Sequence, residues 1–265
     1  MKLYPKSKVV NPLFTGLLLI LLFTYFWKGI SIAIFLVPLV CLAWLVIIIM
    51  GSGYVHWNYH YDSLNHNHGC KDNQIALTFD DGPHPERTPI VLELLKKFNI
   101  QATFFCIGRE MAAHPELVKR IVTEGHTIGN HTYNHSKNFG FYRPDRVVEE
   151  LQQTDQIAAQ IVQKKLRLFR PPFGVTNPSI KKALLQSQHT SIGWSIRSLD
   201  TKENDKNKLF ERVTIDLKKG DIILLHDTMP ITVEILEDLL IYLRKNNFEA
   251  VTVNKLLNIE AYEKE

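Results

Sequence analysis

The sequence predicts an α/β fold of about seven parallel strands, preceded by an N-terminal transmembrane helical segment or hairpin. Residues 13–50 carry no charge apart from Lys28. From Gln74 onward, short runs rich in β-branched and aromatic residues alternate with amphipathic helical patterns, which is typical of parallel βαβ units. With this number of strands, closure into a barrel competes with an open, doubly wound sheet.

The apolar N-terminal region contains two runs, Leu13 to Trp27 and Ile30 to Met50. At ~1.5 Å per residue, a helix over the second run reaches roughly 31 Å and can cross the hydrocarbon core of a bilayer, whereas the first reaches about 22 Å. We interpret residues 1–50 as a membrane anchor of one or two helices that contacts the bilayer through residues 13–50. The alternative, a cleaved signal peptide, has a shorter apolar segment that ends at small residues.

The side of the cytoplasmic membrane on which the rest of the chain lies depends on the number of spans. The lysines that precede the apolar region, Lys2, Lys6 and Lys8, place the N-terminal tail in the cytoplasm by the positive-inside rule. With one span the C-terminal domain lies outside the cytoplasm, and with two spans it lies in the cytoplasm. Lys28 at the tip of a hairpin, and the absence of Lys and Arg from Gly51 to Cys70, favour an extracytoplasmic domain but do not decide the question.

The charge distribution argues against a nucleic-acid binder. The formal net charge is +4, but residues 1–70 hold four lysines and one acid, so residues 71–265 are nearly neutral. Such a domain lacks the basic surface that nucleic-acid binding needs. The three cysteines, Cys41, Cys70 and Cys106, show no pairing framework and no CxxC motif, and we interpret them as small apolar residues.

We divide the chain into the anchor, a juxtamembrane linker over residues 51–73, a folded domain over residues 74–258 and a charged tail over residues 259–265. The linker is rich in aromatic residues and histidine, which fits a position at the headgroup level of a bilayer. Its four histidines have irregular spacing and no acidic or cysteine partners, so a metal site there is disfavoured.

The elements of the folded domain follow from periodicity and from end signals. Two helices begin at an N-cap residue followed by proline, Thr88 with Pro89 and Asn177 with Pro178. The helix Pro115 to Glu124 places its apolar residues on one face and ends before Gly125. Strands are expected near Ile75–Phe79, Ala102–Cys106, His126–Gly129, Leu168–Arg170, Ser191–Ser195, Asp221–Leu225 and Glu249–Val251.

Polar residues directly follow several of these strands, and the carboxyl ends of parallel strands share one face. Asp80 and Asp81 follow the first strand. Neighbouring residues on a strand point to opposite sides, so both carboxylates can serve one pocket only if the backbone turns, and Gly82-Pro83 supplies a turn. The octet ALTFDDGP alone is equally consistent with an acidic turn that caps the next helix.

Histidines supply the next candidate groups. His131 and His135 are four residues apart, which places them on one face of a helical turn and suits two ligands of one divalent ion. Such a pair also arises by chance on protein surfaces, but an aspartate at a converging strand end strengthens the metal hypothesis. Two histidines and one aspartate leave coordination positions open, as in catalytic sites.

Two further strand ends complete the predicted site. Arg170 begins a loop that two prolines stiffen, Arg170-Pro171-Pro172-Phe173-Gly174. The alternative interpretation of this segment is an ordinary proline turn without a functional role. His226 follows an apolar strand, where a buried histidine needs a hydrogen-bond partner. Because histidine titrates near neutral pH, His226 is a natural proton donor to a leaving group.

Four segments, TFDDGP, HTYNH, RPPFG and LLHD, occur in this order between about Gln74 and Val253. Together they resemble the motifs of the polysaccharide deacetylases with a NodB-type homology domain, carbohydrate esterase family 4. The resemblance implies a distorted, partly open (β/α) barrel in a membrane-anchored member of this family. It also implies a hydrolase that removes N-acetyl or other N-acyl groups from amino sugars of a glycan or glycolipid, using one divalent metal ion.

The resemblance also assigns roles to residues. It implies that Asp80 is the general base, that His226 is the general acid, and that Arg170 positions Asp80. The implied metal ligands are Asp81, His131 and His135, while the Phe173 amide holds the oxyanion and Leu224 lines the acetyl pocket. Zinc is the expected metal, and Co, Mn or Fe also suit these ligands.

The chain departs from the family in its fourth motif, which usually reads Asp, two residues, Asp, Trp. The resemblance implies that the first Asp supports the catalytic histidine, and Arg197 stands at that position here, with Thr201 in place of the tryptophan. A cation beside His226 would lower the pKa of the imidazole. Either Arg197 points away, for example toward Asp200, or another group orients His226.

Three alternatives differ in function class or in substrate. The altered fourth motif is consistent with a catalytically impaired, membrane-bound glycan-binding protein, and the anchor with deacylation of a lipid-linked sugar. A glycosidase is disfavoured, because its two carboxyl groups stand ~5 Å or more apart on opposite sides of the scissile bond. The sequence leaves the glycan open among peptidoglycan, chitin-like oligomers, an exopolysaccharide and a lipid-linked sugar.

Overall fold

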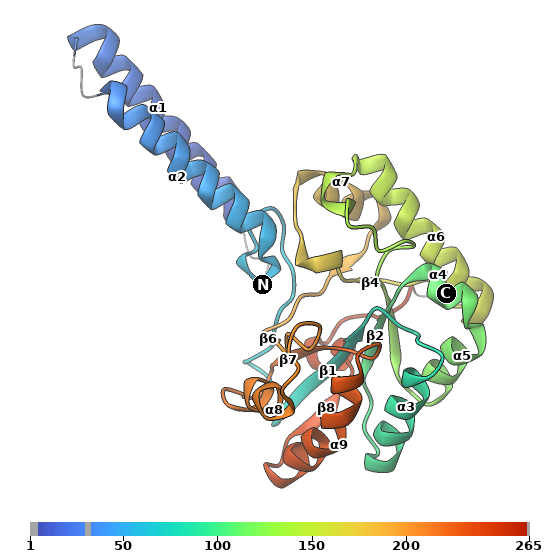
Figure 1. Ribbon diagram of the computed structural model, residues 1–265. Helices are drawn as coiled ribbons and strands as arrows, with labels where there is room; N and C mark the ends of the chain where they lie inside the picture. Colours follow the sequence, from blue (N-terminus) through green and yellow to red (C-terminus); the bar gives the residue numbers. More distant parts are fainter. Residues whose placement is uncertain (1–4, 30–32, 264–265) are drawn as a thin grey trace.

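The computed structural model describes residues 5–29 and 33–263 and shows a half-barrel of parallel strands with two apolar helices projecting from it (Figure 1). The sheet order is β5-β4-β3-β2-β1-β7-β6, with β8 paired to the beginning of β1. Each strand pair is parallel. The strands are β1 Gln74–Asp80, β2 Thr103–Cys106, β3 Thr127–Asn130, β4 Leu168–Phe169, β5 Thr190–Ser191, β6 Ile196–Arg197, β7 Ile222–His226 and β8 Glu249–Val251.

Helices connect the strands and pack on the outside of the curved sheet (Figure 1). The helices of the barrel domain are α3 Arg87–Phe98, α4 Gly108–Ala113, α5 Pro115–Thr123, α6 Pro144–Val162, α7 Pro178–Ser187, α8 Lys206–Thr214, α9 Pro230–Lys245 and α10 Val253–Leu257. Short 3-10 turns lie at Val55–Trp57, Phe139–Phe141 and Pro172–Gly174. The structure confirms the predicted α/β architecture. The sheet forms a half-barrel rather than an open, doubly wound sheet.

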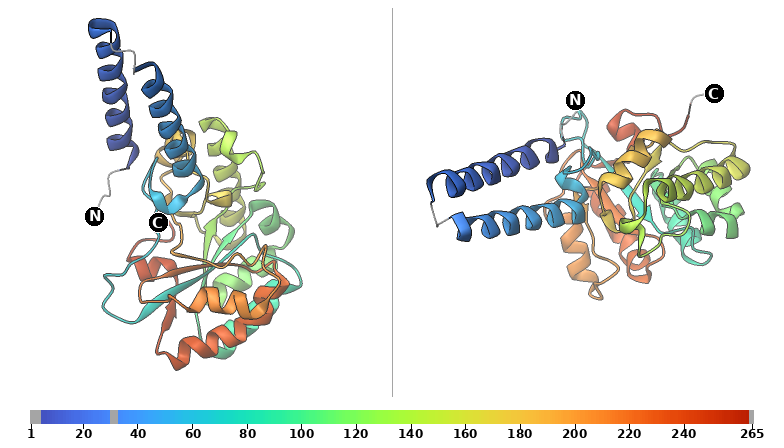
Figure 2. Two further views of the ribbon diagram at one scale, coloured as in Figure 1. Left: turned by 60° about the vertical axis from the view of Figure 1, so that its left-hand side comes forward. Right: turned by 90° about the horizontal axis from the view of Figure 1, so that it is seen from above.

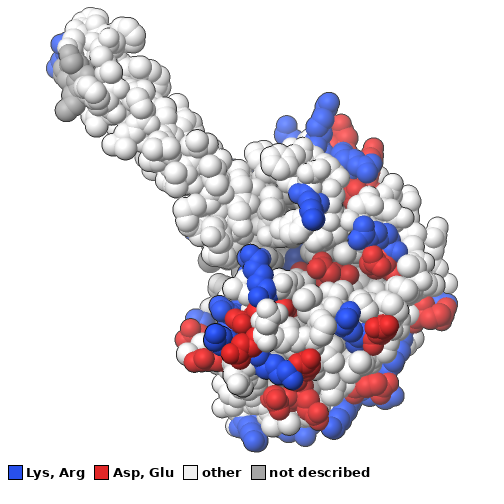
Figure 3. Space-filling view, viewed as in Figure 1, with Lys and Arg blue, Asp and Glu red and all other residues white. Residues whose placement is uncertain are grey.

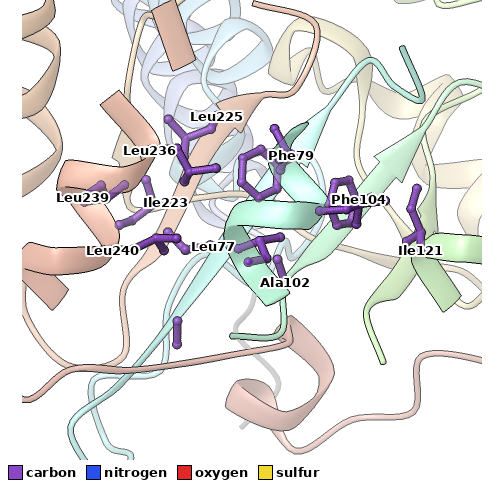
Figure 4. Packing of buried hydrophobic residues seen from close by; sticks show 14 of the residues in the cluster. Leu77, Phe79, Ala102, Phe104, Ile121, Ile223, Leu225, Leu236, Leu239 and Leu240 are labelled. Carbon is purple, nitrogen blue, oxygen red and sulfur yellow. The ribbon is translucent and has the colours of Figure 1, made fainter. Parts of the chain in front are cut away.

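The largest core lies between the sheet and the helices on its outer face (Figure 4). Leu77 and Phe79 of β1 point into this core together with Leu225 of β7. The alternate residues of the same strands face the barrel interior, because successive side chains on a strand point to opposite faces. Asp80 and His226, aligned across β1 and β7, therefore both face the interior.

Several predicted elements are shifted in the structure. The helix predicted to begin at Thr88 begins at Arg87, because the Thr88 hydroxyl accepts from the His84 amide and donates to Asp227 instead of capping the helix. The Asn177 cap is confirmed, since its side chain accepts from the amide of Ile180 at 2.8 Å.

The strand predicted over Ser191–Ser195 is mostly a connection between two short strands, β5 and β6, which lie at opposite edges of the sheet. The chain leaves β5 at Ile192, where it pairs with Leu64, and joins β7 through β6. Gly193 donates to the Leu64 carbonyl at 2.9 Å, so this stretch bonds to an upstream segment rather than continuing β5. Sequence periodicity could not show this, because the partner lies more than a hundred residues away.

Residues 51–73, predicted as a juxtamembrane linker, pack against the barrel. Tyr59 and Tyr61 are buried, and the amide of Leu64 donates to the Ser191 carbonyl at 2.9 Å. Farther along, His66 forms a bridge with Asp221 at the start of β7. The segment thus covers the gap between the two edges of the sheet.

The two apolar helices are α1 Ser7–Lys28 and α2 Ala33–Gly53, and both are long and apolar enough to cross a bilayer. They lie side by side and project away from the barrel (Figure 2). Asn11 of α1 accepts hydrogen bonds from Trp44 of α2 at 3.1 Å and from the Tyr59 hydroxyl at 2.7 Å. These bonds tie the base of the hairpin to the segment that follows it.

Candidate active site

The polar residues predicted to converge lie together at the carboxyl ends of β1, β3, β4 and β7. They line a cavity of about 350 Å³. The residues that line it are Asp80, Asp81, His131, His135, Pro171, Phe173, Gly174, Trp194, Arg197, Thr201, Lys202, Leu224 and His226. Of the residues singled out in the sequence, Arg170 and Asp200 lie behind the cavity surface and act through their neighbours.

Asp81, His131 and His135 form a candidate metal centre. One ligand atom from each lies within 4.8 Å of the others. The Asp81 Oδ1 atom stands 3.3 Å from Nε2 of both histidines, and this buried oxygen has no hydrogen-bond partner in the described chain. A buried carboxylate oxygen between two imidazole nitrogens fits a divalent cation, which would supply its missing partner.

The protonation of these groups also suits a metal. His131 Nδ1 lies 2.8 Å from the Arg170 carbonyl, which can only accept, so Nδ1 donates to it and Nε2 is the ring nitrogen directed at Asp81. Burial, reinforced by the neighbouring His131, lowers the pKa of His135 to about 4 and keeps its ring neutral. Burial alone would raise the pKa of Asp81, but the adjacent histidines hold it well below its ordinary value.

The two histidines do not lie on a helical turn, so that prediction is wrong. Thr132 and His135 have φ values of 63° and 48°, in the left-handed region. The loop is held from outside the motif, because the buried Glu150 of α6 accepts from the Asn134 amide at 2.8 Å and from its side-chain nitrogen at 2.9 Å. The sequence analysis did not identify Glu150, because a glutamate in an amphipathic helix is predicted to lie on the solvent-exposed face.

Asp80 is fixed by a fully buried arginine. Arg170 Nη1 donates to Asp80 Oδ1 and to Thr78 Oγ1, both at 2.7 Å, and Nη2 donates to the Gly193 carbonyl at 2.8 Å. The guanidinium also stacks over Phe105 at 4.1 Å from the ring centroid. Because Arg170 uses one face of the carboxylate, Asp80 Oδ2 remains directed toward His131, 3.9 Å away.

The backbone turns at Asp81 itself, which has a φ of 74°. This places the two adjacent carboxylates in the same cavity, as the sequence required. Gly82 follows, and a Cβ atom there would lie 2.3 Å from Asp227 Oδ2, so the close approach of the buried Asp227 requires glycine. Burial, together with the nearby Asp81, raises the pKa of Asp227 to about 7 despite its hydrogen bond from Thr88.

His226 is oriented by Asp200 and not by residue 197. His226 Nδ1 and its amide donate to the two carboxylate oxygens of Asp200, both at 2.7 Å, and Thr232 donates to Asp200 at 2.5 Å. Burial opposes protonation of His226, but the hydrogen bond and the charge of Asp200 outweigh it and raise the pKa to about 9. Of the alternatives that the altered motif left open, the structure shows another group, Asp200, orienting His226, and it shows no ion pair between Arg197 and Asp200.

Arg197 is exposed and lines the cavity together with His226, but no hydrogen bond or ion pair joins it to His226. Its guanidinium lies 5.8 Å from the centroid of the Trp194 ring, and it forms no ion pair with Asp200 or with any other described residue. Leu224 lines the cavity floor, and Phe173, at a φ of 58°, lies with its ring 4.7 Å from that of His135.

A parallel half-barrel that gathers two aspartates and three histidines at its strand ends defines the class of glycan deacetylases. The family model for polysaccharide deacetylases matches residues 68–192. A peptidoglycan-N-acetylglucosamine deacetylase of Bacillus cereus is 35% identical over 214 residues, which cover 78% of this chain and 94% of that protein. The chain belongs to the polysaccharide deacetylase family, carbohydrate esterase family 4 (CE4).

Solved structures show the same relationship. Peptidoglycan deacetylase PdaC from Bacillus subtilis is 29% identical, with a TM-score of 0.67 over 71% of this chain and 91% of that one. A CE4 family pseudoenzyme from Bacillus anthracis is 28% identical, with a TM-score of 0.69 over 74% of this chain and 69% of that one. Fold and family thus make this chain a carbohydrate N-deacetylase by class.

Proposed function

We propose that this protein is a membrane-anchored, metal-dependent hydrolase that removes the N-acetyl group from an amino sugar of a glycan or glycolipid. One observation carries the proposal. A candidate metal centre, a carboxylate fixed by a buried arginine and a histidine fixed by a buried carboxylate all face one cavity. The N-acetylated amino sugars named for the relatives indicate the class of substrate.

The residues divide the reaction into two proton transfers. Asp80 takes a proton from the water that attacks the amide carbonyl carbon. The C–N bond then breaks, and the departing nitrogen takes a proton from Nε2 of His226, so that acetate and a free amine leave. The His226 pKa of about 9 keeps this ring protonated at neutral pH.

The positions around these groups support the other roles. Asp81, His131 and His135 would hold one divalent ion, with zinc the first candidate, and the ion supplies polarisation of the carbonyl and a lowered pKa of water. The Phe173 amide is proposed as a donor to the oxyanion, and Leu224 as the floor of the acetyl pocket.

Metal analysis and acetate release from an N-acetylglucosamine oligomer test the proposal. The purified protein should carry about one divalent ion, and His131→Ala should lose the ion together with activity, by about 10³-fold or more. Asp238→Asn, an exposed change on α9, is the matched control. Full, chelator-resistant activity in the His131 variant would refute the metal mechanism.

The likeness to a pseudoenzyme favours one competing function, a glycan-binding protein without activity. Measurements on the wild-type protein distinguish the deacetylase from the glycan-binding protein. Metal binding without acetate release from any N-acetylated substrate would support the binding protein and overturn the deacetylase.

A further inference from the structure

Both membrane-flanking ends of the helical hairpin lie against the barrel domain. At the start of α1, the amides of Lys6 and Ser7 donate to the carbonyls of Asn58 and Tyr59 at 3.0 and 2.9 Å. At the end of α2, the Ser52 carbonyl accepts from the Thr176 amide at 2.7 Å. If the helices span the bilayer, the segment before α1 and the domain therefore lie on the same side.

The hairpin has the dimensions of two spans. Helices of 22 and 21 residues are each roughly 30 Å long, which matches a hydrocarbon core. Between its tip and the domain, the hairpin surface in Figure 3 carries no charged side chain. In an 18-residue apolar window of each helix, 0% and 6% of the residues are buried, so the side chains are free to contact lipid.

The lysines that flank the hairpin are unequally distributed. Lys6 and Lys8 stand at the domain end of α1, whereas the far end carries Lys28. By the positive-inside rule the end richer in lysine is cytoplasmic. The extracytoplasmic side favoured in the sequence depended on a single span, and the two-helix arrangement reverses that preference.

A second cavity, of about 430 Å³, lies where the hairpin meets the barrel. We call it the junction cavity, and it is lined by Gly53, Tyr54, Val55, His56, Asn58, Asn65, His66, Trp194, Ser195 and Arg197. Trp194 and Arg197 also line the catalytic cavity, so the two cavities meet at these side chains. The junction cavity thus extends from the Trp194 and Arg197 wall of the catalytic cavity to the end of α2.

The junction cavity contains one charged side chain, Arg197, and no carboxylate. Burial lowers the pKa of His56 and of His66 in its lining and favours their neutral forms. Lys202 is a second basic residue, in the lining of the catalytic cavity that also contains Asp80 and Asp81. Arg197 has no acidic partner among the described residues. An arginine without such a partner, stacked on a tryptophan, is suited to bidentate binding of a phosphate group.

We propose that the substrate is an N-acetylated amino sugar on a phosphate-bearing lipid of the cytoplasmic leaflet, with its phosphate bound by Arg197 between the two cavities. This rests on the proposed deacetylase function. The sugar then enters the catalytic cavity while the phosphate stays beside Arg197, and the lipid chain leaves through the junction cavity toward the bilayer. Arg197, in place of the acidic residue usual in the family, is the specificity-determining residue.

The test uses the full-length protein in phosphatidylcholine vesicles and three N-acetylglucosamine probes. The first is a phosphodiester of a long-chain alcohol, the second is the neutral glycoside of the same alcohol, and the third is free N-acetylglucosamine 1-phosphate. The phosphodiester should have the highest kcat/KM. Comparison with the third probe separates the contribution of the lipid from that of the phosphate.

Arg197→Gln should lower kcat/KM for the phosphodiester by about tenfold or more, mainly through KM, because a charged hydrogen bond is lost. Its preference for the phosphodiester over the neutral glycoside should fall by the same factor. Arg197→Lys should retain part of that preference, and Arg212→Gln, an exposed arginine on α8 outside both cavities, should retain all of it. An unchanged preference in Arg197→Gln overturns the proposal.

The position of the domain is measured separately. If the domain is cytoplasmic, a fluorescent protein fused to the C-terminus should fluoresce. Protease added outside intact cells should then not cleave residues 71–265. An exported domain, or higher kcat/KM for a soluble peptidoglycan fragment than for the phosphodiester, overturns the lipid substrate while leaving the deacetylase function intact. If the metal-loaded protein releases acetate from none of the probes, the deacetylase function itself is overturned.

Discussion

The catalytic cavity has two walls that differ in origin. The catalytic wall, Asp80, Asp81, His131 and His135, comes from the ends of β1 and β3 and is fixed by buried groups such as Arg170. The junction wall, Trp194 and Arg197 with residues 53–66 behind them, comes from the connection between the sheet edges and from the segment after the hairpin. Our proposals thus assign chemistry to the most constrained part of the barrel, and recognition to the wall that contains Arg197.

The same contrast separates two arginines. Arg170 is 0% exposed and donates to a carboxylate, a hydroxyl and two backbone carbonyls, which use four of its five N–H donors. Its complete burial keeps it out of contact with a ligand. Arg197 is exposed, its guanidinium lies over the Trp194 ring, and it has no ion pair among the described residues. A buried arginine whose donors bond to the core positions its neighbours, whereas an arginine with free donors at a cavity surface is available to substrate.

The largest expected effect comes from the catalytic wall. Asp80→Asn keeps the shape of the side chain but cannot accept a proton, so kcat should fall by about 10²- to 10⁴-fold. Metal content should be unchanged, because Asp81 and the two histidines are intact. Parallel measurement of kcat and of bound metal checks this. Loss of metal in Asp80→Asn would mean that the two adjacent carboxylates do not have separate roles.

The second prediction concerns His226, which faces the catalytic wall but is oriented by Asp200, in the loop after β6, with support from Thr232 of α9. Its raised pKa, about 9, means that the protonated form is lost, and with it activity, as the pH rises through that value. Asp200→Asn removes the charge that raises the pKa, so the alkaline limb of the kcat profile should move to lower pH. At pH 8, kcat should fall by about 10- to 100-fold, with a smaller loss at pH 6. An unmoved alkaline limb would show that Asp200 only packs against His226.

The smallest effect is expected in the structure behind the junction wall. Gly220 has a φ of 84°, and a Cβ atom there would lie 2.1 Å from the Asn67 carbonyl oxygen. Gly220→Ala should reduce the free energy of unfolding by about 2 kcal/mol, because it strains the contact that holds residues 64–67 on the barrel. Gly69→Ala, where the new atom would lie 3.7 Å from Asn67, is the control. Equal denaturation midpoints for the two variants would contradict the view that this segment is integral to the domain.

The sequence by itself was sufficient for the parallel α/β fold, for the two apolar helices and for the convergence of Asp80, Asp81, His131, His135, Arg170 and His226. Period-2 and helical patterns are local, and the carboxyl ends of parallel strands necessarily share a face. Ligand atoms of Asp81, His131 and His135 lie within 4.8 Å of one another, as predicted, but the predicted helical turn was wrong. The loop conformation depends on Glu150, which lies on α6 and cannot be paired with Asn134 from periodicity.

Only the tertiary structure decided what the remaining groups do. It assigned the orientation of His226 to Asp200, directed Arg197 outward, and folded residues 51–73 against the barrel. Each of these depends on contacts between segments far apart in the chain, such as Leu64 with Ile192, or Asp200 with Thr232. Residue type and spacing indicate the candidate reaction chemistry. The way in which the two edges of the sheet are brought together determines which charged side chain faces which cavity.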